Sequence, residues 1–334
     1  MMPLSSRIYV GGHRGLVGSA IVRALCRAGY HNLLLRTHTE LDLTDQAAVY
    51  RFFDDERPQY VFLAAAKVGG IQANRTRPSD FLLENLQIQA NIIGNARHFQ
   101  VERLLFLGSS CIYPKFAAQP IREESLLCGP LEPTNQAYAV AKIAGIEMCR
   151  ASNRQHGTHF LAAMPCNLYG PGDNYDRDSS HVIPALLQKL HAAKLVGETE
   201  VELWGSGTPR REFLYSDDLA TACLQLMELH PQAFDVLITD PVAPALINVG
   251  SGEDLTIADL AALIAEVTGF TGKIRFDASQ PDGTPRKLLD ASRMRALDWM
   301  PETNLRDGLA RAYRDFLSRC DVPELPPVEA LVNS

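Results

Sequence analysis

The chain has 334 residues, of which 46% are hydrophobic and 21% are charged, and its formal net charge is -7. This balance is typical of a globular protein, and the length suggests one large or two ordinary domains with a sizeable core. The acidic charge argues against a nucleic-acid partner, because such proteins carry a basic surface. It leaves room for a local cationic pocket that binds an anionic ligand.

The cysteines and the apolar runs indicate the cellular compartment in which we expect the protein. Seven cysteines are scattered along the chain without a CxxC pair. This pattern argues against a disulfide framework and against a zinc site, and it favours the reducing cytoplasm. No apolar run approaches the length of a bilayer span, and the first residues lack an apolar signal core. We therefore expect a cytoplasmic protein with no membrane segment and no metal site.

The first half of the chain alternates short apolar runs with helical patterns. These patterns predict strands at 7–10, 32–36, 60–66, 103–110 and within 159–170, and helices at 15–28, 42–56, 80–99 and 135–152. Strand–helix alternation of this kind is typical of a parallel sheet that has helices on both faces. We predict an α/β fold built on a Rossmann-like doubly wound parallel sheet.

The composition of the sequence changes after Gly170. A polar stretch rich in turn formers is followed by a predicted helix at 182–195 and by shorter strand and helix patterns. We predict a Rossmann domain over 1–170, to which later segments return. A smaller, discontinuous α/β domain would occupy 171–322. The proline-rich end, 323–334, would be a loose tail.

A glycine loop lies between the first predicted strand and the first predicted helix. Gly12, Gly15 and Gly18 form a GxxGxxG pattern. Glycines let the backbone turn sharply and approach a pyrophosphate at a helix N-terminus. The alternative is a simple tight turn, but the position between strand and helix favours dinucleotide binding. The wider first gap resembles the extended short-chain dehydrogenase/reductase superfamily.

Cations after the second strand bear on the choice of dinucleotide. An NAD site usually places an acid there, whereas this chain has Arg36 and His38, and Arg14 lies in the glycine loop. Such cations suit a 2′-phosphate, so we expect NADP, although each could be an ordinary surface charge. Asp42 is placed to meet the adenine, or alternatively to cap a helix.

Tyr138 and Lys142 lie four residues apart in a predicted helix and therefore share a face. An ammonium near a phenol favours the phenolate and should lower the tyrosine pKa from about 10, so that the tyrosine can donate a proton to an alkoxide. Ser109 or Ser110, at a strand end, would orient a substrate carbonyl. A YxxxK pair also arises by chance, but together with the glycine loop it predicts a reductase site.

Eight blocks in order resemble the GDP-L-fucose synthase family over roughly residues 7–320: GHRGLVGSAI, AAAKVGGI, LLFLGSSCIYPK, LEPTNQAYAVAKIAGI, NLYGPGDN, SHVIPALL, WGSGTPRREFL and PDGTPRKLLD. The resemblance implies an NADPH-dependent enzyme that epimerises C3 and C5 of GDP-4-keto-6-deoxy-D-mannose and then reduces C4, which yields GDP-L-fucose. It implies a catalytic set of Ser109, Tyr138, Lys142, Cys111 and His181.

The chemistry explains why a thiol and an imidazole would be added to the reductase site. The ketone at C4 acidifies the protons on C3 and C5, and each inversion removes a proton from one face of the ring and returns it on the other. A thiol with a pKa near roughly 8.5 and an imidazole near roughly 6.5 both exchange protons around neutrality. Cys111 and His181 are the pair that the resemblance implies, although Cys111 could be a packed thiol and His181 a helix cap.

The resemblance also implies which residues hold the two ligands. NADPH or NADP+ would be bound by Gly12, His13, Arg14, Gly15, Leu16, Val17, Gly18, Arg36, His38, Asp42, Ala64, Ala66, Leu107, Gly108, Ser110, Lys142, Pro165, Asn167, Leu168 and His181. The GDP-sugar would be bound by Lys189, Trp204, Arg211 and Asp282, with Arg210 as a further candidate. Arginine suits bidentate contact with phosphate. In two places, His38 and Lys189, many family members have an arginine instead.

Three other interpretations stay open. A 4-epimerase or 4,6-dehydratase would share the scaffold, but dehydratases place an acidic pair where this chain has Cys111 and Ile112. A related enzyme that makes another deoxysugar, such as GDP-colitose, is separated poorly by sequence. A non-catalytic NADP sensor would usually lack the Tyr138–Lys142 pair. We also expect a homodimer formed through a four-helix bundle of the helices near 80–99 and 135–152.

Overall fold

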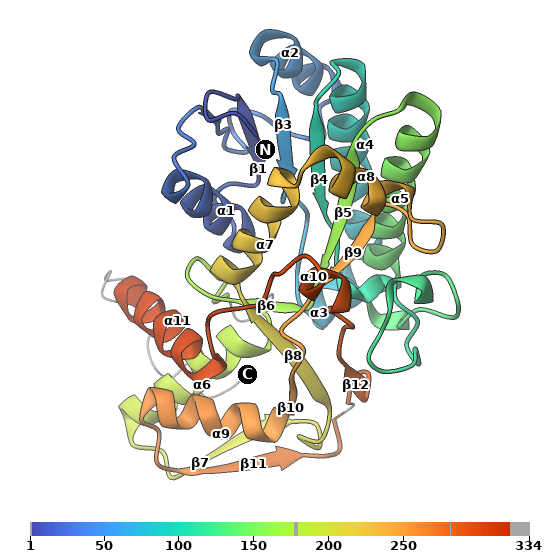
Figure 1. The fold of residues 1–334 in the computed structure, drawn as a ribbon. Coiled ribbons are helices and arrows are strands. Elements are labelled where there is room, and N and C mark those ends of the chain that lie inside the picture. Colours follow the sequence, from blue (N-terminus) through green and yellow to red (C-terminus); the bar gives the residue numbers. More distant parts are fainter. Residues whose placement is uncertain (1, 177–179, 281, 321–334) are drawn as a thin grey trace.

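A six-stranded parallel sheet forms the centre of the larger part of the molecule (Figure 1). The computed structural model describes residues 2–176, 180–280 and 282–320, and its strands run in the order β2, β1, β3, β4, β5, β9. Their bounds are β1 (Ile8–Gly11), β2 (Leu33–Leu34), β3 (Tyr60–Leu63), β4 (Arg103–Leu107), β5 (Phe160–Pro165) and β9 (Leu246–Val249). Every neighbouring pair is parallel. The predicted doubly wound α/β fold is confirmed.

Helices cover both faces of this sheet (Figure 1). On one face α1 (Leu16–Arg27) packs against α7 (Ser216–Glu228), and on the other α4 (Pro78–His98) packs against α2 (Gln46–Glu56) and α5 (Gln136–His156). Arg23 and Arg27 both form ion pairs with Asp217, which joins α1 to α7. Strands β1, β3, β4, β5 and β9 are buried along their whole length. Burial on both faces explains why the sequence of these strands is continuously apolar.

A smaller unit follows, with its own apolar core. Its mixed sheet is built on β8 (Arg210–Tyr215), which pairs in parallel with β6 (Asn167–Tyr169) and β12 (Arg286–Lys287) and antiparallel with β10 (Asp254–Thr256). A second ribbon pairs β7 (Glu200–Trp204) with β11 (Lys273–Asp277). The helices around these strands are α6 (Val182–Val196), α9 (Ile257–Thr268) and α11 (Leu305–Cys320).

The chain crosses between the two units more than once. Helix α7, helix α8 (Pro231–Thr239) and strand β9 all follow residue 171, yet they lie with the large sheet. Short elements complete the described chain: α3 (Ile71–Thr76), α10 (Ser292–Arg295) and the 3-10 turns η1 (Ser110–Ile112), η2 (Glu123–Ser125) and η3 (Pro133–Asn135). The predicted tail at 323–334 lies outside the described residues. Within the described ranges, no helix combines the length and the apolar character that crossing a membrane requires.

The predicted stretch at 42–56 begins with cap-like residues, and the structure shows which of them caps helix α2. The helix starts at Gln46, because the Asp45 carboxylate accepts hydrogen bonds from the backbone N–H groups of Ala47 (2.9 Å) and Ala48 (3.0 Å). This is the arrangement of an N-cap residue, which satisfies two donors that a helix start leaves free. Asp42 instead accepts from the backbone N–H of Thr44 at 2.9 Å in the preceding turn.

This cap gives a direct test of the local structure. Asp45→Ala should lower the free energy of unfolding by about 1 kcal/mol, because two N–H groups at the start of α2 lose their acceptor. Asp55→Ala removes the same charge from an exposed position of the same helix and should change stability by less than about 0.5 kcal/mol. Urea unfolding of both variants measures the difference. Equal destabilisation would show that charge, and not capping, is responsible.

Candidate active site

The predicted cofactor residues gather at the carboxyl ends of five neighbouring strands. Parallel strands bring these ends to one edge of the sheet, where ligands of open α/β folds bind. The loop after β1 holds Gly12, His13, Arg14 and Gly15, and the first turn of α1 holds Leu16, Val17 and Gly18. Strand β2 is followed by Arg36, His38 and Asp42, and β3 by Ala64 and Ala66. Strand β4 ends at Leu107 and is followed by Gly108, Ser109, Ser110 and Cys111, while β5 and β6 carry Pro165, Asn167 and Leu168.

The glycine loop has no room for a side chain at Gly12 or Gly18. Gly12 has φ +82°, and a Cβ there would lie 2.8 Å from the Cα of Ala65, at the end of β3. A Cβ on Gly18 would lie 2.1 Å from the carbonyl oxygen of Gly12. The His13 Nδ1 atom is buried here without a hydrogen-bond partner in the described chain. A tight backbone loop at the start of α1 with an unpartnered polar atom fits a dinucleotide pyrophosphate.

The cations after β2 differ in their ion pairing and in their exposure to solvent. The Arg36 guanidinium is bonded to the Glu56 carboxylate and lies over the Phe52 ring, 5.6 Å from its centroid. The His38 side chain is 82% exposed, and its Nδ1 lies 4.0 Å from an Asp42 carboxylate oxygen. Arg14, in the glycine loop, is exposed. A 2′-phosphate would therefore find Arg14 and His38 accessible, whereas Arg36 would have to be shared with Glu56.

The turn that carries Asp42 is fixed by α4. Asn91 Nδ2 donates hydrogen bonds to the backbone carbonyls of Leu43 (2.9 Å) and Thr44 (3.2 Å). The hydrogen bonds that Thr44 donates to Asp42 lower the pKa of this carboxyl, so the residue stays ionised. Asp42 is thus a fixed anion at the edge of the sheet, which suits hydrogen bonding to an adenine amino group.

Ser109 and Cys111 lie where β4 passes into η1. The Ser109 hydroxyl accepts a hydrogen bond from the backbone N–H of Cys111 at 3.5 Å. Cys111 is only 6% exposed, and this burial raises the pKa of its thiol. Gly108 is needed before them, since a Cβ there would lie 1.9 Å from the methyl carbon of Met164. The turn therefore presents a serine and a cysteine from one short, tightly packed segment.

Tyr138 and Lys142 approach this turn from α5. The Lys142 ammonium donates a hydrogen bond of 2.8 Å to the carbonyl of Leu107, and it lies 4.8 Å from the centre of the Phe106 ring and 5.7 Å from that of Tyr138. Burial lowers the Lys142 pKa to about 8. The side chains of Cys111, Tyr138 and Lys142 interact electrostatically. The structure thus places the predicted Ser–Tyr–Lys set and Cys111 at one site.

One expectation about Tyr138 is wrong for this state of the protein. We expected Lys142 to lower the tyrosine pKa, but burial raises it, and the proximity of Cys111 adds to the increase. The physical reason is that desolvation of the phenolate dominates, while the ammonium is directed at the Leu107 carbonyl. The phenol is therefore protonated in the free protein, which is the form that a proton donor requires.

His181 is placed at the start of α6, as its N-cap residue, and its side chain does not cap the helix. The residue as a whole is exposed, but the protein atoms around the imidazole partly desolvate it and so lower its pKa below the ordinary value. No hydrogen bond or ring contact of the described residues joins His181 to Ser109, Cys111, Tyr138 or Lys142. The imidazole is neutral at physiological pH and free to meet a ligand from the other side of the site.

The four predicted substrate residues lie in the smaller unit. Arg211 belongs to β8, and the negative charge of Asp282 acts on it. Asp282 accepts hydrogen bonds from the Ser206 backbone N–H (2.9 Å) and hydroxyl (2.6 Å). Trp204 is 75% exposed, so its ring is available to stack on a ligand. Lys189 is an exposed residue of α6 whose pKa is lowered by partial desolvation.

The structure revises the set of candidate cations at two positions. Arg210 is held by Asp254 at 2.9 Å and is therefore engaged, so it is a poor phosphate ligand. Lys287, which the sequence reasoning did not single out, is the cation whose charge acts most strongly on Cys111. Its position could be found only from the pairing of β12 with β8, because a two-residue strand leaves no periodic pattern.

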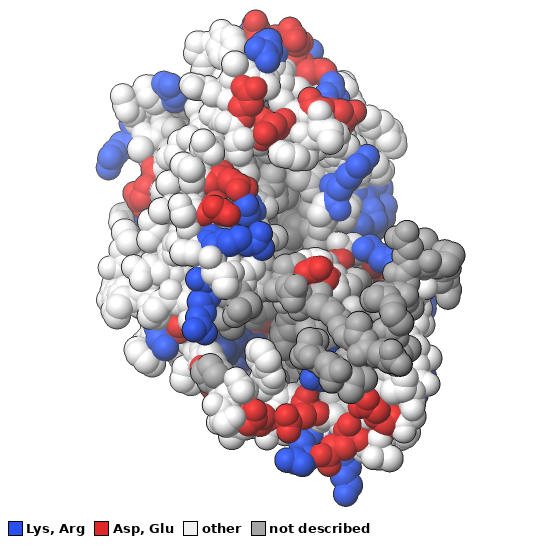
Figure 2. Space-filling model, turned by 180° about the vertical axis from the view of Figure 1, so that it is seen from behind, with Lys and Arg blue, Asp and Glu red and all other residues white. Residues whose placement is uncertain are grey.

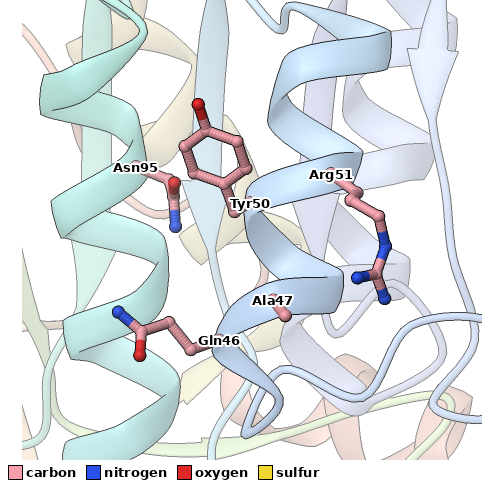
Figure 3. Close-up of a pocket in the computed structure, with 5 residues that line it drawn as sticks. All are labelled: Gln46, Ala47, Tyr50, Arg51 and Asn95. Carbon is pink, nitrogen blue, oxygen red and sulfur yellow. The ribbon is translucent and has the colours of Figure 1, made fainter.

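Two surface features lie outside this site. A shallow pocket between α2 and α4 is lined by Gln46, Ala47, Tyr50, Arg51 and Asn95; Figure 3 shows Gln46 and Tyr50 reaching toward α4 while Arg51 points away. It shares no residue with the strand-end site. On the face seen in Figure 2, acidic and basic side chains of the described residues form small mixed groups.

Comparison with known proteins agrees with this geometry. The model of the NAD dependent epimerase/dehydratase family matches residues 8–236. The chain is 54% identical to GDP-L-fucose synthase 1 of Arabidopsis thaliana over 317 residues, which are 95% of each chain. It is 53% identical to the GDP-L-fucose synthase of Escherichia coli K12, over 94% of this chain and 98% of that one. Identity to the GDP-L-colitose synthase of Yersinia pseudotuberculosis is 36%, over 93% and 98% of the two chains.

The fold also matches those of solved structures over nearly the whole chain. A GDP-6-OMe-4-keto-L-xylo-heptose reductase from Campylobacter jejuni superposes with a TM-score of 0.90 at 38% identity, over 95% of this chain and 99% of that one. A GDP-mannoheptose C4 reductase from the same organism, solved with NADP bound, gives a TM-score of 0.85 at 38% identity, over 95% of this chain and all of that one. Both proteins are reductases of GDP-linked sugars.

The glycine loop gives a test that does not depend on the substrate. Gly18→Ala should weaken NADPH binding by at least about 10-fold, because the new methyl group meets a backbone carbonyl that cannot move away cheaply. Gly94→Ala is the control, since a Cβ at Gly94 in α4 meets no atom within 4 Å. Fluorescence titration with NADPH measures both. Normal NADPH binding by the Gly18 variant would contradict the assignment of this loop.

Proposed function

The chain belongs to the NAD dependent epimerase/dehydratase family, and within it we infer that the protein has the activity of the GDP-L-fucose synthases. It is an NADP-dependent epimerase and reductase that converts GDP-4-keto-6-deoxy-D-mannose to GDP-L-fucose. Identity above 50% over nearly the whole length to proteins of that activity supports this assignment. The observation that carries it is the meeting of Ser109, Cys111, Tyr138 and Lys142 beside the glycine loop.

NADPH is the cofactor that we propose. The cation-rich edge after β2 and Arg14 of the glycine loop favour a 2′-phosphate, and related reductases are known with NADP bound. The loop from Gly12 to Gly18 would hold the pyrophosphate, and Asp42 the adenine. The ends of β3, β4 and β5 would line the rest of the site, and Lys142 would bind the nicotinamide ribose. When bound, NADPH supplies the hydride that reduces C4.

Epimerisation would be the work of Cys111 and His181. The C4 ketone acidifies the hydrogens on C3 and C5, and Ser109 and Tyr138 would stabilise the enolate oxygen by hydrogen bonds. One of the pair would remove each proton and the other would return one to the opposite face of the ring. The two groups approach from different units of the molecule, since Cys111 follows β4 and His181 begins α6. Such placement suits a sugar held between them.

Reduction would then use Tyr138 as the proton donor. Its phenol is protonated in the free protein, because burial raises its pKa. As hydride arrives at C4, the phenol would give its proton to the C4 oxygen. The Lys142 ammonium, close to the ring face, would stabilise the phenolate that is left. Phe81 packs edge-on against the Tyr138 ring with centroids 6.4 Å apart, which limits the orientations of the ring.

The GDP part of the substrate would be bound by the smaller unit. Arg211 would contact the diphosphate, Trp204 would stack on a ring, and Asp282 and Lys189 would complete the site. A related reaction that yields GDP-colitose is the second candidate, because a GDP-L-colitose synthase is 36% identical over nearly the whole chain. The markedly higher identity to fucose synthases favours GDP-L-fucose as the product.

We also propose a homodimer through α4 and α5. The two helices pack against each other along their length, and they expose apolar side chains such as Leu83 (54%) and Val140 (42%). The same pair of helices from a second copy would complete a four-helix bundle and cover these side chains.

The reductase step is tested by Tyr138→Phe. Oxidation of NADPH with GDP-4-keto-6-deoxy-D-mannose, followed at 340 nm, should fall by at least about 100-fold, because the proton donor is lost. Tyr50→Phe, at an exposed tyrosine outside the site, should retain full activity. A Tyr138 variant with wild-type activity would refute the proton-donor role. A wild-type protein that consumes no NADPH would refute the proposed function.

The epimerase step is tested in heavy water. Cys111→Ser should slow uptake of deuterium at C3 or C5 by about 100-fold, because a serine hydroxyl is a much weaker proton-transfer group at neutral pH. Cys128→Ser, at an exposed cysteine, is the matched control. Nuclear magnetic resonance of the sugar, before reduction, measures the exchange at each carbon. Unchanged exchange in the Cys111 variant would exclude the thiol from the mechanism.

A further inference from the structure

The hydrogen bonds within the turn that carries Cys111 are long. The Ile112 N–H donates to the Ser109 carbonyl at 3.2 Å, and the Tyr113 N–H donates to the Ser110 carbonyl at 3.4 Å. The Cys111 N–H donates to the Ser109 hydroxyl at 3.5 Å. Bonds of this kind are normally about 2.9 to 3.0 Å long, so these are weak. Contacts from outside the turn therefore matter for the position of the thiol.

The strongest such contact comes from Tyr113, which ends the turn. Its side chain is buried, with 2% of the residue exposed, and its hydroxyl donates a hydrogen bond of 2.6 Å to the Asn248 side-chain oxygen. Burial raises the pKa of this phenol well above its usual value, so the hydroxyl keeps the proton that it donates. The turn is thus tied to Asn248 by a short, buried bond.

Asn248 is itself firmly held at the edge of the large sheet. It lies on β9, beside β5 (Figure 1), and is fully buried. Its backbone N–H donates to the buried carboxylate of Glu123 at 2.9 Å. Its side-chain amide donates to the carbonyls of Ile121 (2.9 Å) and Asp290 (3.3 Å). Each polar atom of the side chain is used, so the oxygen that accepts from Tyr113 has a fixed position.

The active-site segment after β4 therefore has an anchor at each end. At its start the Gly108 N–H donates to the Ala163 carbonyl of β5 at 2.9 Å, and at its end stands Tyr113. Ser109 directly follows the first anchor. Cys111 is three residues beyond that anchor and two residues before the second. Loss of the second anchor should thus displace the thiol more than the serine hydroxyl.

We propose that Tyr113 is a positioning residue for epimerisation: through Asn248 it fixes the turn so that the Cys111 thiol meets the sugar carbon. This rests on the proposed function, because it takes Cys111 as a proton-transfer group. The phenol of Tyr113 is buried and bonded within the protein, so it acts through Cys111 and not on the substrate. The hydride step, which uses Tyr138 of α5, does not depend on this bond.

The first measurement is deuterium uptake by GDP-4-keto-6-deoxy-D-mannose in heavy water. NADP+ replaces NADPH, so that the ketone exchanges without being reduced. Tyr113→Phe should slow uptake by about 10-fold, because the thiol is less often correctly placed. Nuclear magnetic resonance should show the loss at the same carbon that is slowed in Cys111→Ser. Asn248→Ser removes the acceptor of the same bond and should give the same pattern.

The second measurement isolates the hydride step. Oxidation of GDP-L-fucose by NADP+ starts from the epimerised sugar and needs no inversion at C3 or C5. Single-turnover formation of NADPH, followed at 340 nm, should stay within about 2-fold of wild type in Tyr113→Phe, because Ser109 keeps its own anchor. A general loss of structure would lower both rates.

Tyr60→Phe is the matched control. Tyr60 is also a buried tyrosine whose hydroxyl bonds to a side chain, that of Glu102, but it lies at the amino end of β3, away from the strand-end site. This variant should lose a similar amount of stability and keep wild-type exchange at both carbons. Binding of NADP+ by each variant reports that the fold is intact.

Wild-type exchange in Tyr113→Phe would overturn the inference. Equal losses of exchange and of hydride transfer would also overturn it, and so would the same loss of exchange in Tyr60→Phe. Failure of the proposed function looks different, because the wild-type protein itself would then neither exchange hydrogens at C3 and C5 nor oxidise GDP-L-fucose.

Discussion

The active site depends on one geometric constraint, the common direction of the strands in the large sheet. Because all six strands are parallel, the carboxyl ends of β1 to β5 meet at a single edge, and the loops that follow them are brought together from positions far apart in the chain. The glycine loop, the turn of Asp42 and the Ser109–Cys111 segment are all placed this way. The smaller unit then faces this edge with the residues that would hold the sugar nucleotide.

Burial sets the chemical state of the residues gathered there. It raises the pKa of the Cys111 thiol and of the Tyr138 phenol, and it lowers that of Lys142 to about 8. These changes keep the tyrosine and the thiol protonated, and they bring the pKa of the lysine closer to neutrality, where proton exchange is easiest. Ionisation of the thiol then depends on nearby cations, since a thiolate in a desolvated site needs a counter-ion. The positions of Lys142 and Lys287 are thus part of the chemistry of Cys111.

Much of this arrangement could be predicted from the sequence, because its strongest signals are local. Continuous apolar runs predicted the buried strands, and the glycine loop and the Tyr138–Lys142 spacing predicted the strand-end site. The residue that caps α2 could not be identified from the sequence, since Asp42 and Asp45 are both plausible caps and only the hydrogen bonds distinguish them. The direction of the Tyr138 pKa was also missed, because it depends on burial and not on spacing. Lys287 was overlooked because its importance comes from strand pairing between distant segments.

The central claim is that a sugar ketone is held between a thiol and an imidazole, which reach it from different units of the molecule. A crystal structure of the protein with NADP+ and GDP-L-fucose tests it most directly. The account predicts that the hexose lies between Cys111 Sγ and the His181 ring, with its C4 oxygen within hydrogen-bond distance of the Tyr138 hydroxyl. A hexose that touches neither Cys111 nor His181, or that meets both from the same face of the ring, would contradict it.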